Sequence, residues 1–318
     1  MSEWQTFCLK DLGKIVGGAT PPTNNPKNYG NKIAWITPKD LSTLQGRYIK
    51  KGSRSISRLG FKSCSCVLLP KHAILFSSRA PIGYVAIAEK RLCTNQGFKS
   101  IIPNKKIYFE FLYYLLKYHK DNISNIGGGT TFKEVSGATL GLFEVKIPPT
   151  YYEQQKIART LSVLDQKIEN NHKINERLHN LAHKVYEYYF KYKPKNAKLE
   201  QIIIENPKSS IMVKNAQKTQ DKYPFFTSGD NTLSYPKAII DGRNCFLNTG
   251  GNAGIKFYVG KASYSTDTWC IGANEFSDYL YLLLSSIKTH INQSFFQGTS
   301  LKHLQKNLLK KYPIYMPS

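Results

Sequence analysis

The sequence lacks the motifs that mark most enzymes, metal proteins and membrane proteins. Its 318 residues hold no phosphate-binding Gly-x-x-x-x-Gly-Lys-Ser/Thr loop and no Gly-x-Ser-x-Gly nucleophile turn. The six cysteines form no Cys-x-x-Cys pair, so buried, reduced thiols explain them better than a structural zinc site. No apolar run approaches the roughly 20 residues that cross a membrane. We therefore expect no catalytic residue, no metal ion and no cofactor bound by this chain.

Two partial signals do not change this expectation, and a further observation bears on location. Residues 1–5 have neither the basic nor the apolar segment of a secretory signal, which favours a cytoplasmic protein. Residues 144–146 (Glu-Val-Lys) could end a nuclease motif, but no suitable Asp precedes them and a strand edge explains them better. His179 and His183 lie four residues apart without an evident third metal ligand, and a solvated helix face accounts for both.

Acidic residues are scarce relative to basic ones. Lys and Arg number 45 against 21 Asp and Glu, which gives a net charge of +24 at pH 7. The excess is spread over residues 1–150, 151–198 and 199–318, as suits one long contact with a polyanion such as DNA. An acidic membrane would call for a basic amphipathic or lipidated end, which we do not find. A generally Lys-rich and Asn-rich composition also contributes to the charge.

The first half of the chain is echoed, in the same order, by the second half. Residues 129–133 (GTTFK) match residues 298–302 (GTSLK), 169 positions later. Three further pairs are offset by 168 to 171 positions: 110–116 with 278–284, 78–83 with 249–254, and 147–148 with 316–317. Coincidence among Gly-rich and Leu-rich segments is the alternative. The shared order favours two copies of one domain, and about two domains are what this length predicts.

Each copy is expected to be a mixed α/β unit with short strands and many turns. In the first copy, residues 33–36, 67–76 (interrupted by Pro70), 84–88 and 143–147 have the composition of strands. Residues 107–120 have the spacing of a helix with one apolar face. The fold class is therefore α/β, with two globular domains joined by the segment between them.

The central segment differs in kind from both copies. Residues 153–192 contain no Pro or Gly, and apolar residues recur at alternating steps of four and three, the spacing of a coiled-coil seam. A helix of about 37 residues would extend roughly 55 Å. The expected helix-pairing residues are Ile157, Leu161, Leu164, Ile168, Asn171, Asn175, Leu178 and Val185. Asn within such a seam sets register at a cost in stability, and the stripe as a whole requires a partner helix.

Several segments, taken in order, resemble the specificity subunits of type I restriction–modification systems. Residues 17–21 (GGATP) followed by 34–41 (AWITPKDL) look like the opening of a target recognition domain of that family. Residues 76–83 (FSSRAPIG), residues 94–98 (TNQGF) and the two Gly-Thr-Thr/Ser-x-Lys segments resemble its internal landmarks. Residues 147–158 resemble the entry into its conserved helical region. Singly these motifs are weak, but their order is specific, and the resemblance covers nearly the whole chain.

The resemblance implies two target recognition domains, residues 1–150 and 199–318, held apart by a helical spacer at residues 151–198. It implies a non-catalytic chain that recognises a two-part DNA sequence, one half with each domain. By the same resemblance, methyltransferase subunits dock on the helical region, bind S-adenosylmethionine and modify adenine. A separate motor-nuclease subunit completes the complex.

The sequence departs from the family pattern at one point. Family members usually place a second conserved helix after the second recognition domain, whereas this sequence stops at Ser318, near the counterpart of residues 147–149. The apolar stripe is therefore expected to pair in trans with a second copy, with methyltransferase helices or with a separately encoded fragment. An antiparallel self-pair would place Asn171 and Asn175 near its middle, and we expect a homodimer.

Loop residues of both copies suit contact with duplex DNA. Gly and hydroxyl groups can approach phosphates, Arg can pair with guanine, and Asn or Gln amides can recognise adenine. The expected DNA-binding residues are Ser78, Arg79, Asn95, Gln96, Thr130, Thr131, Lys133, Asn248, Thr249, Asn252, Thr299, Ser300 and Lys302. The Gly-rich segments could instead serve a helix-to-strand turn, and Asn95 and Gln96 an internal turn hydrogen bond.

We therefore expect a DNA-recognition subunit that directs adenine methylation and cleavage by its partner subunits. Two alternatives remain. One is the recognition half of a type II-like restriction–methylation enzyme whose catalytic parts lie elsewhere, and the other is a non-catalytic, basic DNA-binding scaffold. A two-part methylation motif in host DNA would favour the first interpretation. Catalytic modules encoded in one adjacent chain would favour the type II-like enzyme.

Overall fold

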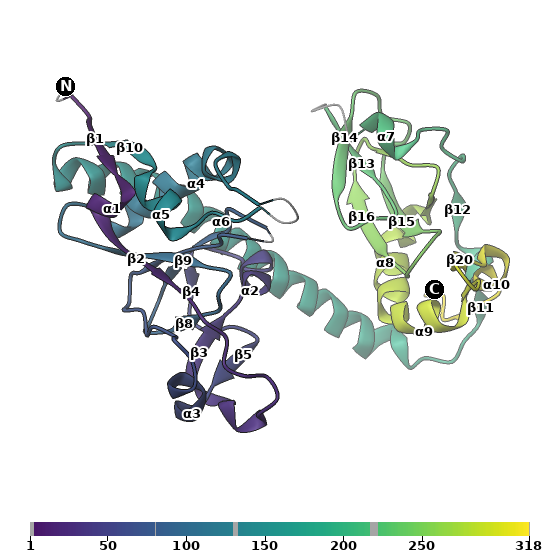
Figure 1. Cartoon of the computed structure of the whole chain (residues 1–318). Coiled ribbons are helices and arrows are strands. Elements are labelled where there is room, and N and C mark those ends of the chain that lie inside the picture. The colour runs from purple at the N-terminus through teal and green to yellow at the C-terminus, as the bar shows by residue number, and fades with distance from the viewer. Residues whose placement is uncertain (1–2, 80, 130–132, 217–221, 318) are drawn as a thin grey trace. The chain divides into compact units, whose positions relative to one another are not determined.

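The computed structural model describes residues 3–79, 81–129, 133–216 and 222–317 (Figure 1). The chain divides into two compact units, Met1–Ile174 and Asn175–Ser318, called the first and the second unit below. The division lies inside one long helix, so each unit includes a part of that helix.

The first unit is made of short strands and, apart from α4 and α6, short helices. Its elements are β1 (Gln5–Cys8), α1 (Leu9–Leu12), β2 (Gly13–Gly17), η1 (Pro26–Asn28), β3 (Tyr29–Ile36), α2 (Pro38–Ser42), β4 (Tyr48–Ile49), β5 (Arg54–Ile56), α3 (Arg58–Lys62), β6 (Ile74–Phe76), β7 (Val85–Ala88), β8 (Cys93–Thr94), β9 (Lys99–Pro103), α4 (Phe109–Asn125), α5 (Gly137–Leu142), β10 (Glu144–Ile147) and the first part of α6 (Tyr151–Tyr186). Five strands form one sheet in the order β2-β9-β6-β7-β4, and three form another in the order β5-β3-β8. β1 pairs antiparallel with β10, next to the start of α6.

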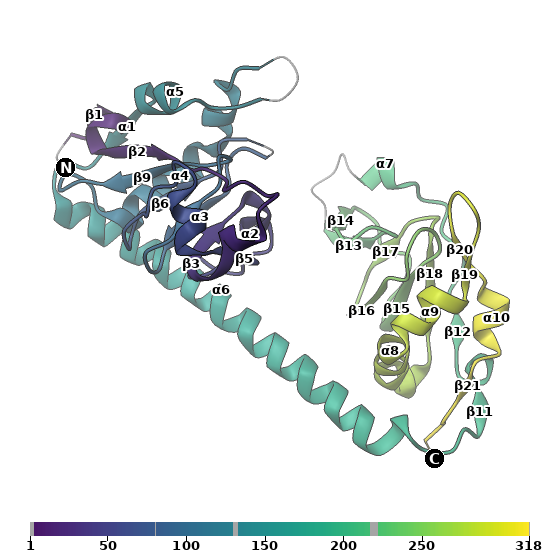
Figure 2. The same cartoon turned by 60° about the horizontal axis from the view of Figure 1, so that its bottom comes forward.

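Helix α4 covers the first unit's larger sheet (Figure 2). Its apolar residues recur at the helical spacing and bury Phe111, Leu112, Leu115 and Leu116 in the core, against β6 and β7. The buried side chain of Gln154 on α6 accepts a hydrogen bond from the backbone N–H of Tyr108, just before α4, at 2.8 Å. That bond fixes the beginning of α6 to the beginning of α4.

The second unit begins with the end of α6, which is followed by a short π-helix. Its elements after α6 are η2 (Glu187–Lys191), β11 (Ala197–Lys198), η3 (Leu199–Gln201), β12 (Ile204–Glu205), α7 (Val213–Ala216), β13 (Tyr223–Phe226), β14 (Thr232–Tyr235), β15 (Arg243–Asn248), β16 (Ile255–Val259), β17 (Ser263–Tyr264), β18 (Thr268–Gly272), η4 (Asn274–Phe276), α8 (Ser277–Ser286), α9 (Lys288–Ser294), β19 (Phe296–Gln297), β20 (His303–Leu304), α10 (Lys306–Lys310) and β21 (Pro313–Ile314).

The second unit repeats the topology of the first. The sheet order β12-β18-β15-β16 corresponds to β2-β9-β6-β7, and β14-β13-β17 corresponds to β5-β3-β8. In both three-stranded sheets the inner strand pairs antiparallel with one neighbour and parallel with the other. Helix α8 packs on β15 and β16 as α4 packs on β6 and β7, and β11 pairs with β21 as β1 pairs with β10. The predicted two copies of one α/β domain are confirmed.

The long central helix is also confirmed. The hydroxyl of Thr150 accepts a hydrogen bond from the backbone N–H of Glu153 at 3.2 Å and donates to its carboxylate at 2.9 Å, which caps the N-terminus. Helix α6 then runs over Tyr151–Tyr186 and passes into η2, so the predicted span 153–192 is right to within a few residues.

One predicted strand is mostly wrong. Of residues 67–76, only β6 (Ile74–Phe76) is a strand. Leu69 forms an isolated bridge with Leu92, and His72 adopts a φ of 70°, which turns the chain before β6 begins. Pro70 has no backbone N–H to give to a ladder, and this explains the interruption.

Candidate nucleic-acid interface

Three loops of the first unit meet where β6 ends and β9 begins. The backbone N–H of Ser78 donates to the carbonyl of Gly97 at 2.8 Å, and the N–H of Val135 donates to the carbonyl of Ser78 at 2.9 Å. Gly128 and Glu134 exchange two backbone hydrogen bonds, of 3.1 and 2.8 Å. We call the described parts of residues 77–83, 95–98 and 127–135 the first junction. It contains most of the DNA-contact residues predicted for this copy.

Two of the predicted contact residues point into the first junction. Ser78 is fully buried, and its hydroxyl donates to the carbonyl of Gly97 at 3.3 Å. The side-chain oxygen of Asn95 accepts a hydrogen bond from the N–H of Gly97 at 3.0 Å, which is the internal turn considered above. The Ser78 side chain is therefore enclosed in this conformation, and its contact with DNA stays a prediction. Asn95 shapes the turn.

Charged groups occupy the rim of the first junction. A guanidinium nitrogen of Arg79 lies 3.7 Å from one carboxylate oxygen of Glu134, and Nζ of Lys99 lies 3.2 Å from the other. The side chain of Arg79 remains 38% exposed, so a ligand can still approach it. Lys133 is exposed as well. The predicted contacts Thr130 and Thr131 lie outside the described residues.

A fourth segment, which carries the Gly-Gly-Ala-Thr-Pro motif of residues 17–21, joins this region. The Thr20 hydroxyl donates to the side-chain oxygen of Gln96, and the indole N–H of Trp35 donates to the carbonyl of Ala19 at 3.0 Å. Gly18 lies against backbone carbonyls: a Cβ there would be 2.0 Å from the carbonyl oxygen of Asn95. Only glycine fits at that position. Gln96 itself is exposed.

The second unit has an equivalent second junction, formed by residues 248–254, 265–268 and 297–304. The N–H of Thr249 donates to the carbonyl of Asp267 at 3.1 Å, and the N–H of Leu304 donates to the carbonyl of Thr249 at 3.0 Å. Gln297 pairs with His303, as Gly128 pairs with Glu134 in the first unit. The same backbone scheme is therefore built twice, from segments that differ in sequence.

Residues of the second junction also divide into inward and outward groups. Asn248 is buried, and its side-chain nitrogen donates to the carbonyl of Asn252 at 3.2 Å. The contact of its amide with DNA stays a prediction. The Thr249 hydroxyl donates to the carbonyl of Asp267 at 2.8 Å and is half-buried. The exposed members of the predicted set are Asn252, Thr299, Ser300 and Lys302.

The two junctions differ in charge. The backbone bridge between Arg79 and Glu134 in the first junction corresponds to the bridge between Gly250 and His303 in the second. Glu134 therefore lies where the second junction has His303, and Arg79 lies where it has Gly250. The first rim thus combines a carboxylate with two cations, whereas the second has none of these three side chains at the matching places. Sequence reasoning missed Glu134, although it lies next to a predicted contact residue.

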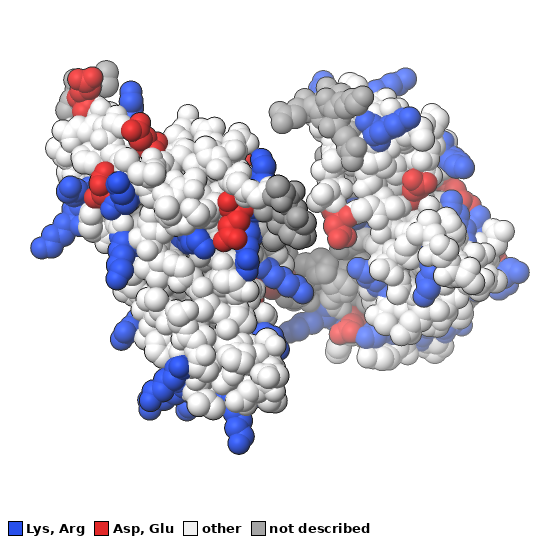
Figure 3. Space-filling view, in the orientation of Figure 1, with Lys and Arg blue, Asp and Glu red and all other residues white. Residues whose placement is uncertain are grey.

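A basic lobe adjoins the three-stranded sheet of the first unit. Residues 12–88 contain a single carboxylate side chain, Asp40, whose oxygens bind Thr37 and Ser53. We define the basic lobe as the surface that carries the exposed side chains of Lys27, Lys32, Lys50, Lys51, Arg54, Arg58 and Lys62. Figure 3 shows Lys and Arg without Asp or Glu on the visible face around α3. The sequence carries this signal as the long interval with Asp40 as its one acidic residue, but the predicted contact set did not include the cations of this interval.

A buried arginine holds α6 to the first unit. Nε of Arg47 and its backbone N–H both lie 3.1 Å from a carboxylate oxygen of Glu169, and Asp165 accepts a hydrogen bond from the Tyr114 hydroxyl at 2.8 Å. Glu110 lies 3.6 Å from Arg47 on the α4 side. Burial alone would lower the pKa of Arg47, but its hydrogen bond to Glu169 raises it above the ordinary value. The charge is therefore permanent, and the network fixes the direction in which α6 leaves the unit.

Beyond Ile157, the predicted seam of α6 lies largely in solvent. Ile157 is half-buried against the core of the first unit, and its role in helix pairing stays a prediction. Apolar residues at or beside the seam are exposed, among them Leu161, Leu164, Ile168, Ile174, Leu178, Leu181 and Val185. Asn171 and Asn175 are exposed in the same stretch. A contiguous apolar surface of this kind marks an interaction site.

The described part of the chain offers neither a cluster of metal ligands nor a membrane-spanning helix. No group of three His, Cys, Asp or Glu is placed there to hold a metal ion. Among residues 3–79, 81–129, 133–216 and 222–317, no helix is both long enough and apolar enough to span a bilayer. The cysteines are unpaired, and burial raises the pKa of the Cys270 thiol to about 12, which keeps it protonated.

Comparison with known families decides the assignment. Residues 1–180 and 195–318 match the family described as the type I restriction modification DNA specificity domain. The chain belongs to this family. It is 46% identical over 191 residues to the type I restriction enzyme MjaIX specificity subunit of Methanocaldococcus jannaschii, covering 59% of this chain and 44% of the relative. The putative MjaX specificity subunit of the same organism is 30% identical over 173 residues, 54% of this chain and 38% of the relative.

The fold is similar to that of a solved member of the same kind. The crystal structure of a type I restriction–modification S subunit from M. genitalium superposes with a TM-score of 0.62 at 18% identity. The superposition covers 98% of this chain and 84% of that chain. By contrast, the chain spans less than half the length of the two M. jannaschii relatives it matches.

Proposed function

We propose that this chain is the DNA-recognition subunit of a type I restriction–modification complex. Each unit would recognise one half of a two-part duplex target through its own junction. The observation that carries the proposal is the duplicated backbone scheme of the junctions, because two copies of one recognition device suit a divided sequence. The net charge of +24 supplies the attraction to phosphates.

Exposed residues of the junctions divide into two proposed roles. Arg79, Gln96 and Asn252 have side chains that can form paired hydrogen bonds with base edges. Lys133 and Lys302 follow the Gly-rich segments and are suited to phosphates, as are the hydroxyls of Thr299 and Ser300. The buried Ser78 and Asn248, with Asn95 and Thr249, hold the loops in shape. The basic lobe adds contacts that anchor the first unit along the backbone of the duplex.

The chain's partners follow from the same proposal. Methyltransferase subunits would bind S-adenosylmethionine and modify adenine in the recognised sequence, and a motor-nuclease subunit would cleave DNA. This chain would contribute recognition without catalysis and without a cofactor of its own, in the cytoplasm. The names of its relatives, which are specificity subunits, support this division of labour.

Residues 151–198 would serve as a spacer between recognition domains 1–150 and 199–318. The exposed seam of the spacer helix suits antiparallel pairing with a second copy. If Asn171 of one copy lies opposite Asn175 of the other, equal steps in opposite directions place Ile168 opposite Leu178, and Leu161 opposite Val185. The Asn side chains then satisfy each other inside an apolar contact.

Footprinting on duplex DNA tests the proposed function. The chain, alone or with its methyltransferase, should protect two short stretches of DNA separated by a gap whose base sequence does not affect binding. Exchanging residues 199–318 for those of another family member should change one half of the target and leave the other half intact. A single uninterrupted specific site would contradict the proposal.

A further inference from the structure

The larger sheets of the two units differ at one edge. In the first unit the sheet ends with β4, which runs parallel to β7. The N–H of Ile87 donates to the carbonyl of Arg47 at 2.8 Å, and the N–H of Glu89 donates to the carbonyl of Ile49 at 3.0 Å. The larger sheet of the second unit ends with β16, the counterpart of β7, at the margin of that sheet (Figure 2). Among the described residues, no strand closes this edge as β4 closes the other.

A shorter connection accounts for the difference. Residues 37–53 join β3 to β5 in the first unit, and they include α2 and β4. Residues 227–231 join the corresponding strands β13 and β14, which form a direct hairpin. The hairpin leaves no segment at this point of the chain to form a strand beside β16.

The outer side of β16 presents unbonded main-chain groups. Hydrogen bonds of 3.0 Å lie at both ends of its ladder with β15, from Asn248 to the carbonyl of Gly254 and from Gly260 to the carbonyl of Gly242. Because bonded and unbonded residues alternate in an antiparallel ladder, every second residue between these ends faces away from β15. These residues, called the open edge below, are Ile255, Phe257 and Val259. No group in the described part of the chain binds their N–H or carbonyl groups.

The open edge corresponds to the residues that β4 binds in the first unit. The repeat places β15 on β6. The two ladders then align Phe257 with Ile87. Two residues further along, Val259 aligns with Glu89. The N–H groups that a neighbouring strand binds in one unit are therefore available in the other.

The strand β16 has none of the usual features that protect a sheet edge. Such strands are commonly guarded by Pro, by a bulge or by an outward Lys side chain. β16 contains no Pro and keeps an unbroken register with β15. Nζ of its Lys256 turns inward and donates to the carbonyl of Thr227 at 2.6 Å. Val259 is 52% exposed, so a second strand can approach the open edge.

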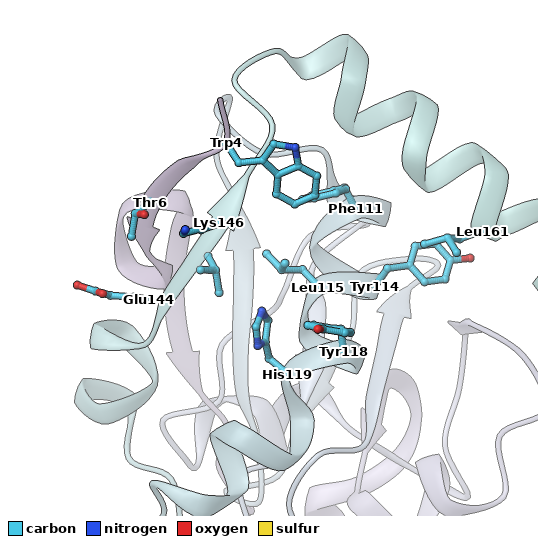
Figure 4. A pocket seen from close by; sticks show the side chains of 11 residues that line it. Trp4, Thr6, Phe111, Tyr114, Leu115, Tyr118, His119, Glu144, Lys146 and Leu161 are labelled. Carbon is cyan, nitrogen blue, oxygen red and sulfur yellow. The ribbon is translucent and has the colours of Figure 1, made fainter. Parts of the chain in front are cut away.

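The chain's own β4 cannot supply the missing strand, because it is fixed inside the first unit. Arg47, at the start of β4, binds Glu169 of α6. Tyr114 of α4 reaches the same helix: its hydroxyl donates to Asp165, and Figure 4 shows it beside Leu161. β4 is thus held by β7 on one side and, through Arg47, by α6. The β4 of a second copy is held in the same way, so the strand must come from a different protein.

The side chains around the open edge indicate what the incoming strand carries. In the first unit the Tyr48 hydroxyl of β4 donates to Glu110 of α4, and Ile49 is buried on the opposite face. At the 168-residue offset of the two helices, Glu110 corresponds to Asp278 of α8, which pairs with the exposed side chain of Arg243. A hydroxyl-bearing or cationic side chain of the incoming strand can therefore bind Asp278, as Tyr48 binds Glu110.

We propose that the open edge binds an extended segment of another protein as a strand parallel to β16. The carbonyls of the segment accept hydrogen bonds from the N–H groups of Phe257 and Val259, and one of its side chains binds Asp278. Main-chain pairing supplies the affinity in this mode of recognition, and side-chain contacts supply the specificity. The proposal adds a protein-binding site to the second unit, and it holds or fails independently of DNA recognition.

A peptide copy of β4 tests the proposal on the full chain. The probe is residues 44–52 (LQGRYIKKG). The reporter is the amide NMR signal of Val259 in valine-labelled protein, identified by its absence from the Val259→Leu variant. We expect this signal to shift as peptide is added, with a Kd of about 1 mM or lower, since one short strand makes few contacts. A signal that stays in place at about five times that concentration overturns the proposal.

Two methylated peptides form a matched pair. In the parallel ladder the N–H of Ile49 faces the neighbouring strand, whereas the N–H of Tyr48 faces away. N-methylation at Ile49 should therefore weaken binding by about tenfold or more, and N-methylation at Tyr48 should leave it nearly unchanged. Equal binding of the two peptides contradicts a strand parallel to β16.

Variants of the chain test the same contacts from the other side. Val259→Pro removes an edge N–H, a change that edge strands tolerate, and should broaden the peptide's own signals far less, with binding weakened by about tenfold or more. Val259→Ala keeps the N–H and should bind like the wild type, whereas Asp278→Asn should bind several-fold more weakly. Thermal unfolding verifies that each variant folds, and the methylated peptides decide the question on the unaltered chain if Val259→Pro does not. Unchanged binding in folded Val259→Pro, or in Asp278→Asn, contradicts the proposal.

Discussion

At the residue scale, asparagine side chains of the junctions either bind backbone groups inside the loops or face solvent. Asn95 and Asn248 turn inward to backbone groups, whereas Asn252 faces solvent. A glycine stands against each inward amide: a Cβ at Gly97 would lie 3.0 Å from the side-chain oxygen of Asn95, and one at Gly254 would lie 2.2 Å from the side-chain nitrogen of Asn248. Sequence reasoning found the residue types but not their directions, because direction depends on these contacts between loops.

Substitution of Gly18 should destabilise the first unit. In Gly18→Ala the new methyl group would meet the Asn95 carbonyl, and relieving such overpacking costs about 1–3 kcal/mol. Gly17→Ala is the matched control, because nothing lies within 4 Å of a Cβ there. Urea unfolding followed by circular dichroism should place the Gly18→Ala midpoint clearly lower and leave the control near the wild-type value. Equal midpoints for the two variants would contradict the close approach.

Removal of the Glu134 carboxylate should strengthen DNA binding. Glu134→Gln takes one negative charge from the rim and frees Arg79 and Lys99, a change of about 1 kcal/mol, or roughly fivefold in affinity. Fluorescence anisotropy with a labelled duplex measures the effect. Glu89→Gln makes the same charge change at another exposed position of the first unit and should have a smaller effect. Equal gains from the two variants would mean that only net charge matters.

At the scale of elements, periodicity predicted helices better than strands. The stripe of α6 and the apolar face of α4 repeat over several turns, so both helices were found within a few residues. Strands of two to five residues carry too little pattern, and the turn at His72 shortened one of them to Ile74–Phe76. The network around Arg47 joins residues more than 100 positions apart, and no local pattern indicates it.

Loss of Arg47 should weaken the attachment of α6 to the first unit. Arg47→Met leaves Glu110, Asp165 and Glu169 close together without their cation, and breaking a buried ion pair of this kind costs about 3 kcal/mol. Hydrogen exchange should show faster opening of α6 near residues 157–170, together with a lower unfolding midpoint. Arg58→Met, at an exposed position on α3, should leave both unchanged. Unchanged exchange in Arg47→Met would mean that packing alone holds the helix.

At the scale of the whole molecule, the internal repeat carried most of the prediction. Four short matches implied two copies of one domain, and the matching sheet orders and junctions bear this out. The basic lobe could not be found in this way, because it distinguishes the first unit from the second. The family resemblance concerns features that the two units share, whereas the structure also shows features that one unit has and the other lacks.

Charge in the seam should abolish self-pairing. Ile168→Glu places a carboxylate opposite Leu178 of a second copy, and burying it there is unfavourable by several kcal/mol. Light scattering at micromolar concentration should report a dimer for the wild type and a monomer for this variant. Val163→Glu adds the same charge at an exposed position beside the seam and should preserve the dimer. A wild-type monomer, or a dimer unaffected by Ile168→Glu, would contradict the proposed register.

The salt dependence of DNA binding should reveal the basic lobe. Each phosphate contact adds about −0.9 to the slope of log K against log [salt]. Lys50→Gln/Arg54→Gln/Arg58→Gln should therefore flatten the slope by up to about 2.7 if all three residues bind phosphates, while base preference at both half-sites stays the same. Lys90→Gln/Arg91→Gln/Lys105→Gln removes the same charge from exposed positions of the first unit outside the lobe. Equal slopes for the two triple variants would assign the effect to net charge, whereas a flatter slope in the lobe variant alone places the duplex against the three-stranded sheet of the first unit.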